Sequence, residues 1–316
     1  MKNTVRESLF YVKKRVLDIL CTVSVPCRRF SPEKNILIFS YPRSGSTWLM
    51  ELINNLPNTV NLWEPLHLRN VAVFRELGFG WRQHIPEGTK WEEAEQAFEN
   101  LLRGKYLNFW LASRSFPLKF CLADQMIIKF VRANGLLPWL TQHFSFQYRP
   151  LYLLRHPFAV AASQAKEGSW DYEFDEYNIP QMPYNSLFVE HSTFLKSVNT
   201  KHAAMVATWC INNKYVLEHP RHNIDWIPVY YENLLLDPER QLQNIFKRWE
   251  EPYPADVFSN LRGASSTTKE ATFRENVQAQ LSKWQHFFEK DEIDEMQAVL
   301  DYFGVNTYSK DLMPYS

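Results

Sequence analysis

The stretch NILIFSYPRSGSTWLMELI, residues 35–53, decides the fold and indicates where a site lies. Its residues 36–40 form a short apolar run that is typical of a buried strand. A turn of Pro, Ser and Gly residues ends this strand, and the small hydroxyl residues after it can cap a helix through residues 48–53. The sequence therefore predicts a strand, a tight loop and a helix in succession.

A loop of this kind is suited to binding an anion. The N-terminus of a helix presents backbone N–H groups and the positive end of its dipole. Gly45 lets the main chain approach a ligand closely, Arg43 adds a full positive charge, and hydroxyl donors come from Ser44, Ser46 and Thr47. We expect the ligand to be a phosphate or sulfate group.

Two alternatives to this interpretation exist. One is a plain strand–turn–helix corner without a ligand. The other is the nucleoside triphosphate loop G-x-x-x-x-G-K-[ST]. Tyr41 stands where that motif has its first Gly, and Ser46 stands where it has its Lys. The helix start is preserved, but the lysine that grips the β- and γ-phosphates is missing.

A second strand–turn–helix pattern occurs in LYLLRHPFAVAAS, residues 151–163. Arg155 follows the strand, at the carboxyl edge where parallel sheets bind ligands, and its planar fork suits a phosphate. Pro157 is tolerated in the first turn of a helix. Ser163 lies two turns further along, and we interpret His156 as a turn residue. Considered without the first loop, an Arg that follows a strand would be interpreted as a surface ion-pair partner.

Together these two segments resemble the sulfotransferases that use 3′-phosphoadenosine 5′-phosphosulfate (PAPS). Residues 41–48, YPRSGSTW, are similar to the family's 5′-phosphosulfate loop, in the Arg-containing form of its carbohydrate-type and bacterial branches. Residues 151–163 are similar to the segment that holds the 3′-phosphate. The resemblance implies that Arg43 and the loop bind the 5′ end, that Arg155 and Ser163 bind the 3′-phosphate, and that Trp48 packs near the adenine.

A third segment, TVNLWEPLH at residues 59–67, concerns the acceptor. Its Glu-Pro-Leu pattern resembles the place where carbohydrate-type sulfotransferases keep a carboxylate near the acceptor hydroxyl, which makes Glu64 a candidate catalytic base. We expect Pro65 to bias Glu64 toward an extended conformation and nearby anions to raise its proton affinity. A solvent-facing Glu64 is the alternative role, and His67 is the alternative base.

The implied activity is transfer of a sulfuryl group from PAPS to an acceptor hydroxyl, of a carbohydrate or a glycolipid. Arg43 and Glu64 are then the catalytic residues, and no metal is expected. A nucleotide or small-molecule kinase, or a non-catalytic nucleotide-binding relative, stays open as the other function.

Composition is that of a globular protein. The 316 residues are 45% hydrophobic and 22% charged, with a formal net charge of zero. Nucleic-acid binders are broadly basic, so no nucleic-acid partner is expected. The four cysteines, Cys21, Cys27, Cys121 and Cys210, show no metal-ligand spacing and suggest reduced thiols in a cytoplasmic protein.

The remaining chain alternates between expected strands, at 125–130 and 226–231, and expected helices, at 91–102, 201–219 and 293–303. This alternation predicts an α/β fold with a P-loop-like parallel sheet flanked by helices on both faces. Pro228 argues for a strand that lies at the sheet edge or has an irregular start. We expect a single sulfotransferase-like domain over residues 31–316.

Residues 1–30 are expected to form a leader segment in which Lys13, Lys14 and Arg15 precede an apolar run. This leader is either a helix packed on the domain or a peripheral contact with anionic lipid.

Two further segments resemble the family near the C-terminus. Residues 231–239, YENLLLDPE, are similar to a strand-end signature, in which Tyr231 either packs internally or contacts the adenine. In the Ser/Thr-rich loop at 262–273, Arg262 and Lys269 are the candidates for closing over the nucleotide.

Overall fold

The computed structural model describes residues 2–24, 30–168, 186–258 and 277–315, so Cys27, Arg262 and Lys269 lie outside the described residues. Five parallel strands form one sheet in the order β2-β3-β1-β4-β5. The strands are β1 (Ile36–Ser40), β2 (Thr59–Trp63), β3 (Gln125–Phe130), β4 (Leu151–Leu154) and β5 (Ile227–Tyr230).

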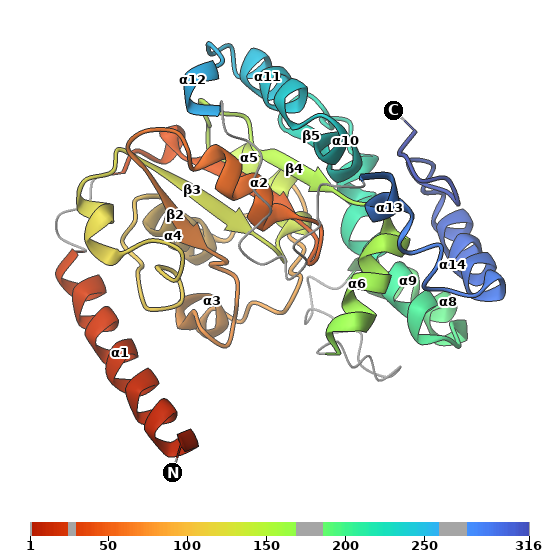
Figure 1. The fold of residues 1–316 in the computed structure, drawn as a ribbon, viewed down its shortest axis with the longest axis horizontal. Coiled ribbons are helices and arrows are strands. Elements are labelled where there is room, and N and C mark those ends of the chain that lie inside the picture. The colour runs from red at the N-terminus through yellow and green to blue at the C-terminus, as the bar shows by residue number, and fades with distance from the viewer. Residues whose placement is uncertain (1, 25–29, 169–185, 259–276, 316) are drawn as a thin grey trace.

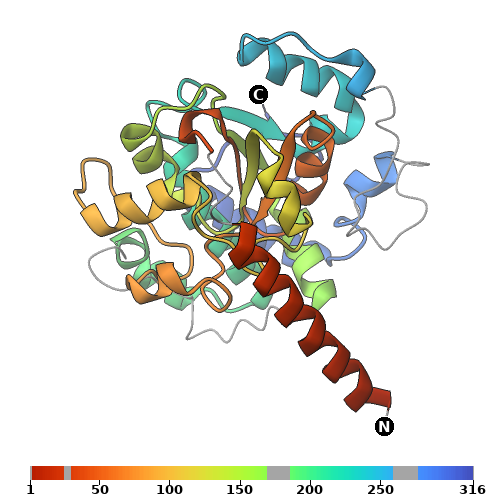
Figure 2. The same ribbon diagram turned by 90° about the vertical axis from the view of Figure 1, so that its left-hand side faces the viewer.

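Helices lie on both faces of this sheet (Figures 1 and 2). Those of one face pack through a core that includes α2 (Ser46–Ile53), α10 (Tyr231–Leu236) and α11 (Pro238–Arg248). The core of the other face includes α4 (Glu92–Leu102), α5 (Leu137–His143), α6 (Pro157–Glu167), α9 (Lys201–Leu217) and α14 (Lys290–Phe303). The predicted α/β class, with a parallel sheet covered on both faces, is therefore confirmed.

The remaining elements complete the described chain. They are the α-helices α1 (Lys2–Ser24), α3 (Ala72–Glu76), α7 (Ser186–Glu190), α8 (Ser192–Ser197), α12 (Ala255–Phe258) and α13 (Val277–Ser282), and the 3₁₀ turns η2 (Pro32–Lys34), η3 (Pro117–Cys121) and η4 (Asn134–Leu136).

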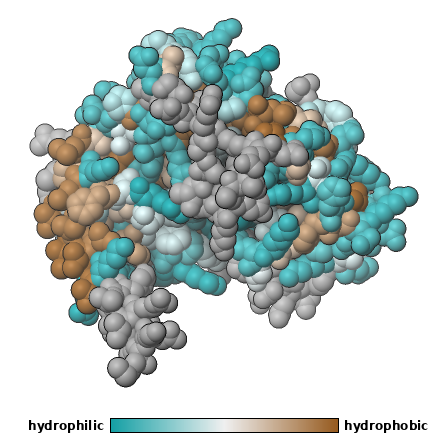
Figure 3. Space-filling view, in the orientation of Figure 1, coloured by the Kyte–Doolittle hydropathy of each residue, from teal (hydrophilic) through white to brown (hydrophobic). Residues whose placement is uncertain are grey.

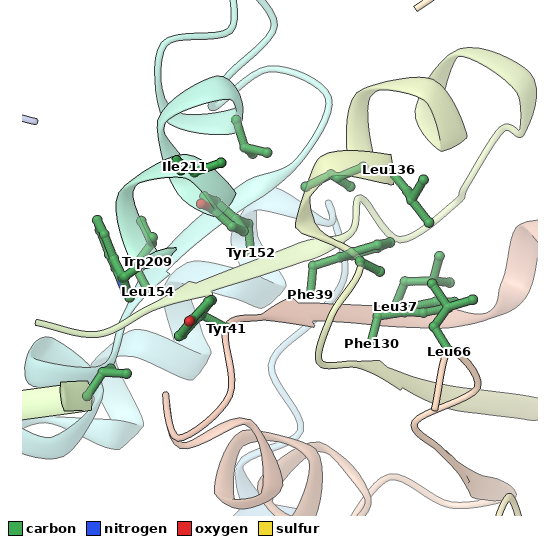
Figure 4. Close-up of a cluster of buried hydrophobic side chains, with 14 of the residues drawn as sticks. Leu37, Phe39, Tyr41, Leu66, Phe130, Leu136, Tyr152, Leu154, Trp209 and Ile211 are labelled. Carbon is green, nitrogen blue, oxygen red and sulfur yellow. The ribbon is translucent and has the colours of Figure 1, made fainter. Parts of the chain in front are cut away.

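Both faces of the strands are buried, which explains their near-continuous apolar sequences. In β1, Leu37 and Phe39 join the core of the α9 face, whereas Ile36 and Ile38 join that of the α2 face. Figure 4 shows the first of these cores, where the ring of Phe39 stacks on that of Phe130 with centroids 4.8 Å apart. A strand that is apolar at its first four positions is thus fixed between two layers of helices.

Strand β5 is an edge strand, as Pro228 predicts. It is shorter than the run read from the sequence, because Tyr231 begins α10 and does not extend the strand. A Pro residue cannot donate a ladder hydrogen bond, so its place at an edge costs the sheet little.

Helix α1 packs on the body of the protein through its C-terminal part. Cys21 and Ser24 are buried, and Asp18 Oδ1 accepts a hydrogen bond of 2.8 Å from the backbone N–H of Phe109. This agrees with the expected packing of the leader helix on the domain. Within the described ranges, no helix has the length and apolarity needed to cross a membrane.

Candidate active site

The loops that follow β1 and β4 lie side by side. These strands are neighbours in the sheet, with Ser40 opposite Leu153. Both loops therefore leave the same carboxyl edge, the position at which open α/β sheets bind ligands. The two segments that the sequence singles out meet because of this strand order, although Arg43 and Arg155 are 112 residues apart on the chain.

The first loop turns sharply before α2 begins. Arg43 and Gly45 have positive φ angles of 71° and 89°, and Gly45 precedes the helix as its N-cap. The amides of Trp48 and Leu49 donate to the Gly45 carbonyl at 3.0 and 3.2 Å. A helix start leaves its earliest amides without intrahelical acceptors, so those of Ser46 and Thr47 are suited to an anion.

Ser44 is fully buried in this loop. Its hydroxyl has no hydrogen-bond partner among the residues that the structure describes. Because an unsatisfied buried hydroxyl is costly, a ligand that accepts from it would remove this cost.

Gly45 is required here for a reason that the sequence does not reveal. A Cβ atom at this position would lie 2.5 Å from Cδ2 of Tyr231, which no real side chain tolerates. Tyr231 is buried, so the expectation of a packed Tyr agrees with the structure. Its ring also contacts Trp48 edge-on, with centroids 6.1 Å apart, and Trp48 itself is only 3% exposed.

Arg155 joins the second loop to the first. Its Nη1 donates a 2.8 Å hydrogen bond to the carbonyl of Arg43, and its guanidinium lies 4.5 Å from the centroid of the Tyr231 ring. The Nε of Arg155 is buried and has no hydrogen-bond partner within the described part of the chain. The guanidinium is thus fixed in place and keeps a donor for a ligand.

The side chain of Arg43 reaches across to α6. Its Nε donates to Ser163 Oγ at 3.2 Å, and its Nη1 forms a 3.2 Å ion pair with Glu167. The resemblance assigns Arg43 and Ser163 to opposite ends of one nucleotide, whereas the structure brings their side chains into contact. Arg43, Arg155 and Ser163 therefore form one continuous group.

Glu64 stands at the same edge, directly after β2. Its carboxylate accepts from two cations: Lys129 Nζ lies 3.0 Å from Oε1, and Arg132 Nη1 lies 3.2 Å from Oε2. Lys129 is only 2% exposed, and its Nζ lies 3.2 Å from the centroid of the Trp63 ring. Glu64 is therefore an ion-paired carboxylate, and the alternative of a solvent-facing side chain is wrong.

Two expectations about Glu64 are corrected by this geometry. Burial alone would raise the pKa of Glu64, but the charges of Lys129 and Arg132 outweigh burial and hold this pKa below its usual range. Its backbone is also not extended, because φ is 38°. Hydrogen bonds from Glu64 N to Lys129 O, at 3.1 Å, and from Trp110 Nε1 to Glu64 O, at 3.2 Å, hold the tight turn.

Lys129 connects the carboxylate to the first loop. Besides its ion pair with Glu64, its Nζ donates to Thr47 Oγ1 at 3.3 Å. Burial lowers the pKa of Lys129 to about 8, and the charge of Glu64 limits the fall. Lys129 is the residue that sequence reasoning missed, although a lysine inside the apolar run of residues 125–130 was a visible signal.

His67 lies on the far side of Glu64, between two indole rings. Its ring centroid is 5.2 Å from that of Trp81 and 4.3 Å from that of Trp110. Burial, together with the charge of Arg132, lowers the pKa of His67, so the imidazole is neutral near pH 7. Trp81 and Trp110 come from the Trp-rich region between β2 and β3, and they give this side of the site aromatic faces.

His156 supports the second loop, in line with its interpretation as a turn residue. Its Nδ1 accepts from the amide of Phe158 at 3.1 Å, and its Nε2 donates to the carbonyls of Ser309 and Asp311 at 2.9 and 3.0 Å. These contacts define a neutral tautomer, and burial lowers the pKa of His156 to about 4.

Glu232, in the YEN segment, ties the same loop to the C-terminal segment. Its carboxylate accepts from the amide of His156 at 2.8 Å and from the hydroxyl of Tyr308 at 3.1 Å. It is 2% exposed, and burial raises its pKa. Glu232 thus positions the turn that carries Arg155.

The described residues contain no group of three or more His, Cys, Asp or Glu side chains that could hold a metal ion. Cys21, Cys121 and Cys210 form no disulfide with one another.

Comparison with known proteins identifies the family. The model of the sulfotransferase domain matches residues 33–302, and the chain therefore belongs to the sulfotransferase family. Family membership makes it a sulfotransferase enzyme. No protein with a curated description matches the chain.

Several solved structures are similar. The sulfotransferase domain of the Synechococcus PCC 7002 olefin synthase has 19% identity and a TM-score of 0.45, with 84% of this chain and 95% of that chain covered. The mouse sulfotransferase SULT7A1, solved in complex with PAP, has 14% identity and a TM-score of 0.45 over 92% and 90% of the two chains. The sulfotransferase STF1 from Mycobacterium tuberculosis has 13% identity and a TM-score of 0.38 over 80% and 77%.

Proposed function

We propose that this protein transfers the sulfuryl group of PAPS to a hydroxyl of a carbohydrate or glycolipid acceptor. One observation supports this most directly: Arg155 bonds to the Arg43 carbonyl, and the Arg43 side chain bonds to Ser163. Two anion-binding loops at one sheet edge suit a ligand with two separate anionic groups. A nucleotide with a 5′-phosphosulfate and a 3′-phosphate is such a ligand.

In this proposal the loop of residues 43–47 binds the 5′-phosphosulfate. The amides at the start of α2 and the hydroxyls of Ser44 and Thr47 contact its oxygens. Arg155 and Ser163 bind the 3′-phosphate, with Arg43 beside them. Because Trp48 and Tyr231 are both buried next to this loop, an adenine would meet the edges of their rings.

The reaction is an in-line displacement at sulfur. The acceptor oxygen forms a bond to sulfur while the bond from sulfur to the bridging phosphate oxygen breaks, and 3′,5′-adenosine bisphosphate leaves. The acceptor proton passes to Glu64, with His67 as the alternative base. Transition states of this kind are loose, so positioning and charge stabilisation supply most of the catalysis.

In this proposal Lys129 stabilises the leaving oxygen. Its ammonium lies between Thr47 of the donor loop and Glu64 on the acceptor side. With a pKa of about 8 it is mostly charged near pH 7. A fixed charge in a buried position acts on developing negative charge without reorganisation. We therefore add Lys129 to Arg43 and Glu64 as a catalytic residue.

The acceptor side favours a ring-bearing substrate. Trp81 and Trp110 flank His67 next to Glu64, and aromatic faces pack well against the apolar faces of sugar rings.

The cytoplasmic location and the division into a leader, residues 1–30, and one domain, residues 31–316, stay predictions.

A kinase function is less well supported, because Ser46 replaces the lysine of the triphosphate loop. A non-catalytic relative would keep both anion sites but transfer no sulfuryl group.

Thermal unfolding with added nucleotide tests the donor assignment. We expect 3′,5′-adenosine bisphosphate to raise the unfolding temperature and ATP to do so much less. Arg155→Ala should abolish the effect, whereas Arg103→Ala, at an exposed arginine paired with Glu99, should leave it intact. Equal stabilisation by ATP, or full stabilisation of Arg155→Ala, would overturn the assignment.

A further inference from the structure

Helix α1 carries an exposed apolar stripe. Val12, Val16, Ile19 and Val23 are 60%, 51%, 62% and 59% exposed. Their spacing of four, three and four residues places all four side chains on one face of the helix. Single exposed apolar residues are normal on a protein surface, but a stripe along three helical turns is not.

The stripe does not stand alone. Around η3, against which α1 packs, Phe116, Leu118 and Leu122 are also exposed, Leu122 at 80%. The space-filling view shows a hydrophobic area at the left of the molecule, where Figure 1 places α1 (Figure 3). We call these seven residues, four on α1 and three around η3, the apolar surface.

The body of the protein holds α1 so that the stripe faces outward. Cys21 and Ser24, on the opposite side of the helix, are buried, and Asp18 is bonded to the amide of Phe109. The outward face is therefore fixed by packing.

Basic residues border the apolar surface. Lys13 and Arg15 are exposed on the two flanks of the stripe, and Lys119 is exposed on η3. Lys14 is exposed on the opposite face of the helix. Between residues 11 and 24 the only acidic residue is Asp18, which is engaged with Phe109. An amphipathic helix with Lys and Arg beside its apolar face is typical of segments that lie in the interface of an anionic membrane.

We propose that the apolar surface and its basic border bind the surface of an anionic lipid bilayer. The apolar side chains enter the boundary between headgroups and acyl chains, while Lys13, Arg15 and Lys119 contact lipid headgroups. A second copy of this chain fits less well, because a two-fold interface would place the Lys13–Arg15 cluster of one copy near that of the other.

This docking would place the acceptor side of the site near the lipid. Phe109, which bonds to Asp18 of α1, is followed by Trp110, whose indole donates to the Glu64 carbonyl. The segment that holds α1 thus also forms a wall beside Glu64.

Flotation with lipid vesicles tests the proposal on the full-length protein. Vesicles of phosphatidylcholine alone are compared with vesicles that also contain phosphatidylserine. We expect binding only to the anionic vesicles and weaker binding at high salt. The double variant Lys13→Gln/Arg15→Gln should lose about fivefold in partitioning for each charge removed. Val16→Asp should lose at least as much partitioning as the removal of one such charge, about fivefold.

Control variants separate this surface from general surface effects. Val189→Asp on α7, where Val189 is 57% exposed, and Lys247→Glu on α11 should bind vesicles as the wild type does. Sedimentation velocity checks for dimers. Three results would each overturn the proposal: no binding to anionic vesicles, equal binding by Val16→Asp, or a dimer that Val16→Asp dissociates. A variant that loses vesicle binding but is still stabilised by 3′,5′-adenosine bisphosphate shows an effect on the apolar surface alone. The test is therefore independent of the proposed transfer activity.

Discussion

Lys129 Nζ lies 3.0 Å from the carboxylate of Glu64, and this pair joins the two halves of the candidate site. The residues come from adjacent strands, since Trp63, the neighbour of Glu64, is paired with Lys129 in the sheet. The same ammonium donates to Thr47 at the start of α2. A carboxylate and a buried cation are therefore held together beside the loop that follows β1.

Replacing Glu64 with Gln tests the proposed base. The amide keeps the size of the side chain but cannot take up the acceptor proton, so we expect transfer to fall by about 10² to 10⁴-fold. Binding of adenosine bisphosphate should change little. Product formation from PAPS under saturating donor measures the effect. Unchanged transfer in the variant would move the role to His67, whereas no transfer by the wild type would indicate that the protein is not a catalyst.

The pH dependence of turnover tests Lys129. Burial lowers the pKa of this ammonium to about 8, so its charge is present below that pH and lost above it. We expect kcat to fall as the pH rises through 8. Arg is charged at every accessible pH, so Lys129→Arg should be slower but lack this alkaline limb, and Lys129→Met should be nearly inactive. A wild-type profile that stays flat up to pH 10 would contradict the role.

Gly45→Ala should disrupt the donor loop. The new methyl group would meet the ring of Tyr231 at 2.5 Å, in addition to the strain of a φ of 89°. We expect a loss of about 2 kcal/mol in stability and a marked loss of nucleotide binding. Gly78→Ala is the matched control, because Gly78 has a φ of 84° but open space around its Cβ position. Unfolding in urea compares the two, and equal losses would exclude a special role for the ring contact.

Acid should weaken the anchoring of the second loop. The pKa of His156 is lowered by burial to about 4, so between about pH 6.5 and 4 the unfolded chain binds a proton that the folded protein does not. Stability is therefore lost as the pH falls through this window, by about 2 kcal/mol at pH 5. His84, with a pKa also lowered to about 4, adds to this loss, whereas Glu232, whose pKa is raised, opposes it.

Urea unfolding at pH 7 and pH 5 measures this effect. His156→Gln should be less stable than the wild type at pH 7 but lose less stability on acidification. A variant with the same pH dependence as the wild type would assign the effect to other groups, such as His84.

The local pattern of each loop was sufficient to predict the two strand–turn–helix segments that are proposed to bind anions. Residues 35–53 and 151–163 each show a strand, a turn and a helix start, and these signals are local in sequence. Their adjacency follows from the strand order, which places β4 next to β1. The prediction that β5 is an edge strand depended on Pro228 alone, because the missing N–H limits where such a strand can lie.

The acceptor side could not be predicted as well. The pKa of Glu64 was expected to be raised, but it is lowered by the charges of Lys129 and Arg132. Lys129 lies in β3 and Arg132 follows β3, so both are more than 60 residues away from Glu64 in the sequence. Only the insertion of β3 between β2 and β1 brings Lys129 to both Glu64 and Thr47. No periodicity in the sequence indicates this strand order.

The measurement that tests the central claim most directly is calorimetric titration with 3′,5′-adenosine bisphosphate and with 5′-AMP, which lacks the 3′-phosphate. In the wild type the bisphosphate should bind at least about tenfold more tightly, because Arg155 forms a charge-assisted contact with the extra group. In Arg155→Ala the two affinities should become similar. Equal affinities in the wild type, or a preference for the bisphosphate that survives in Arg155→Ala, would contradict the account.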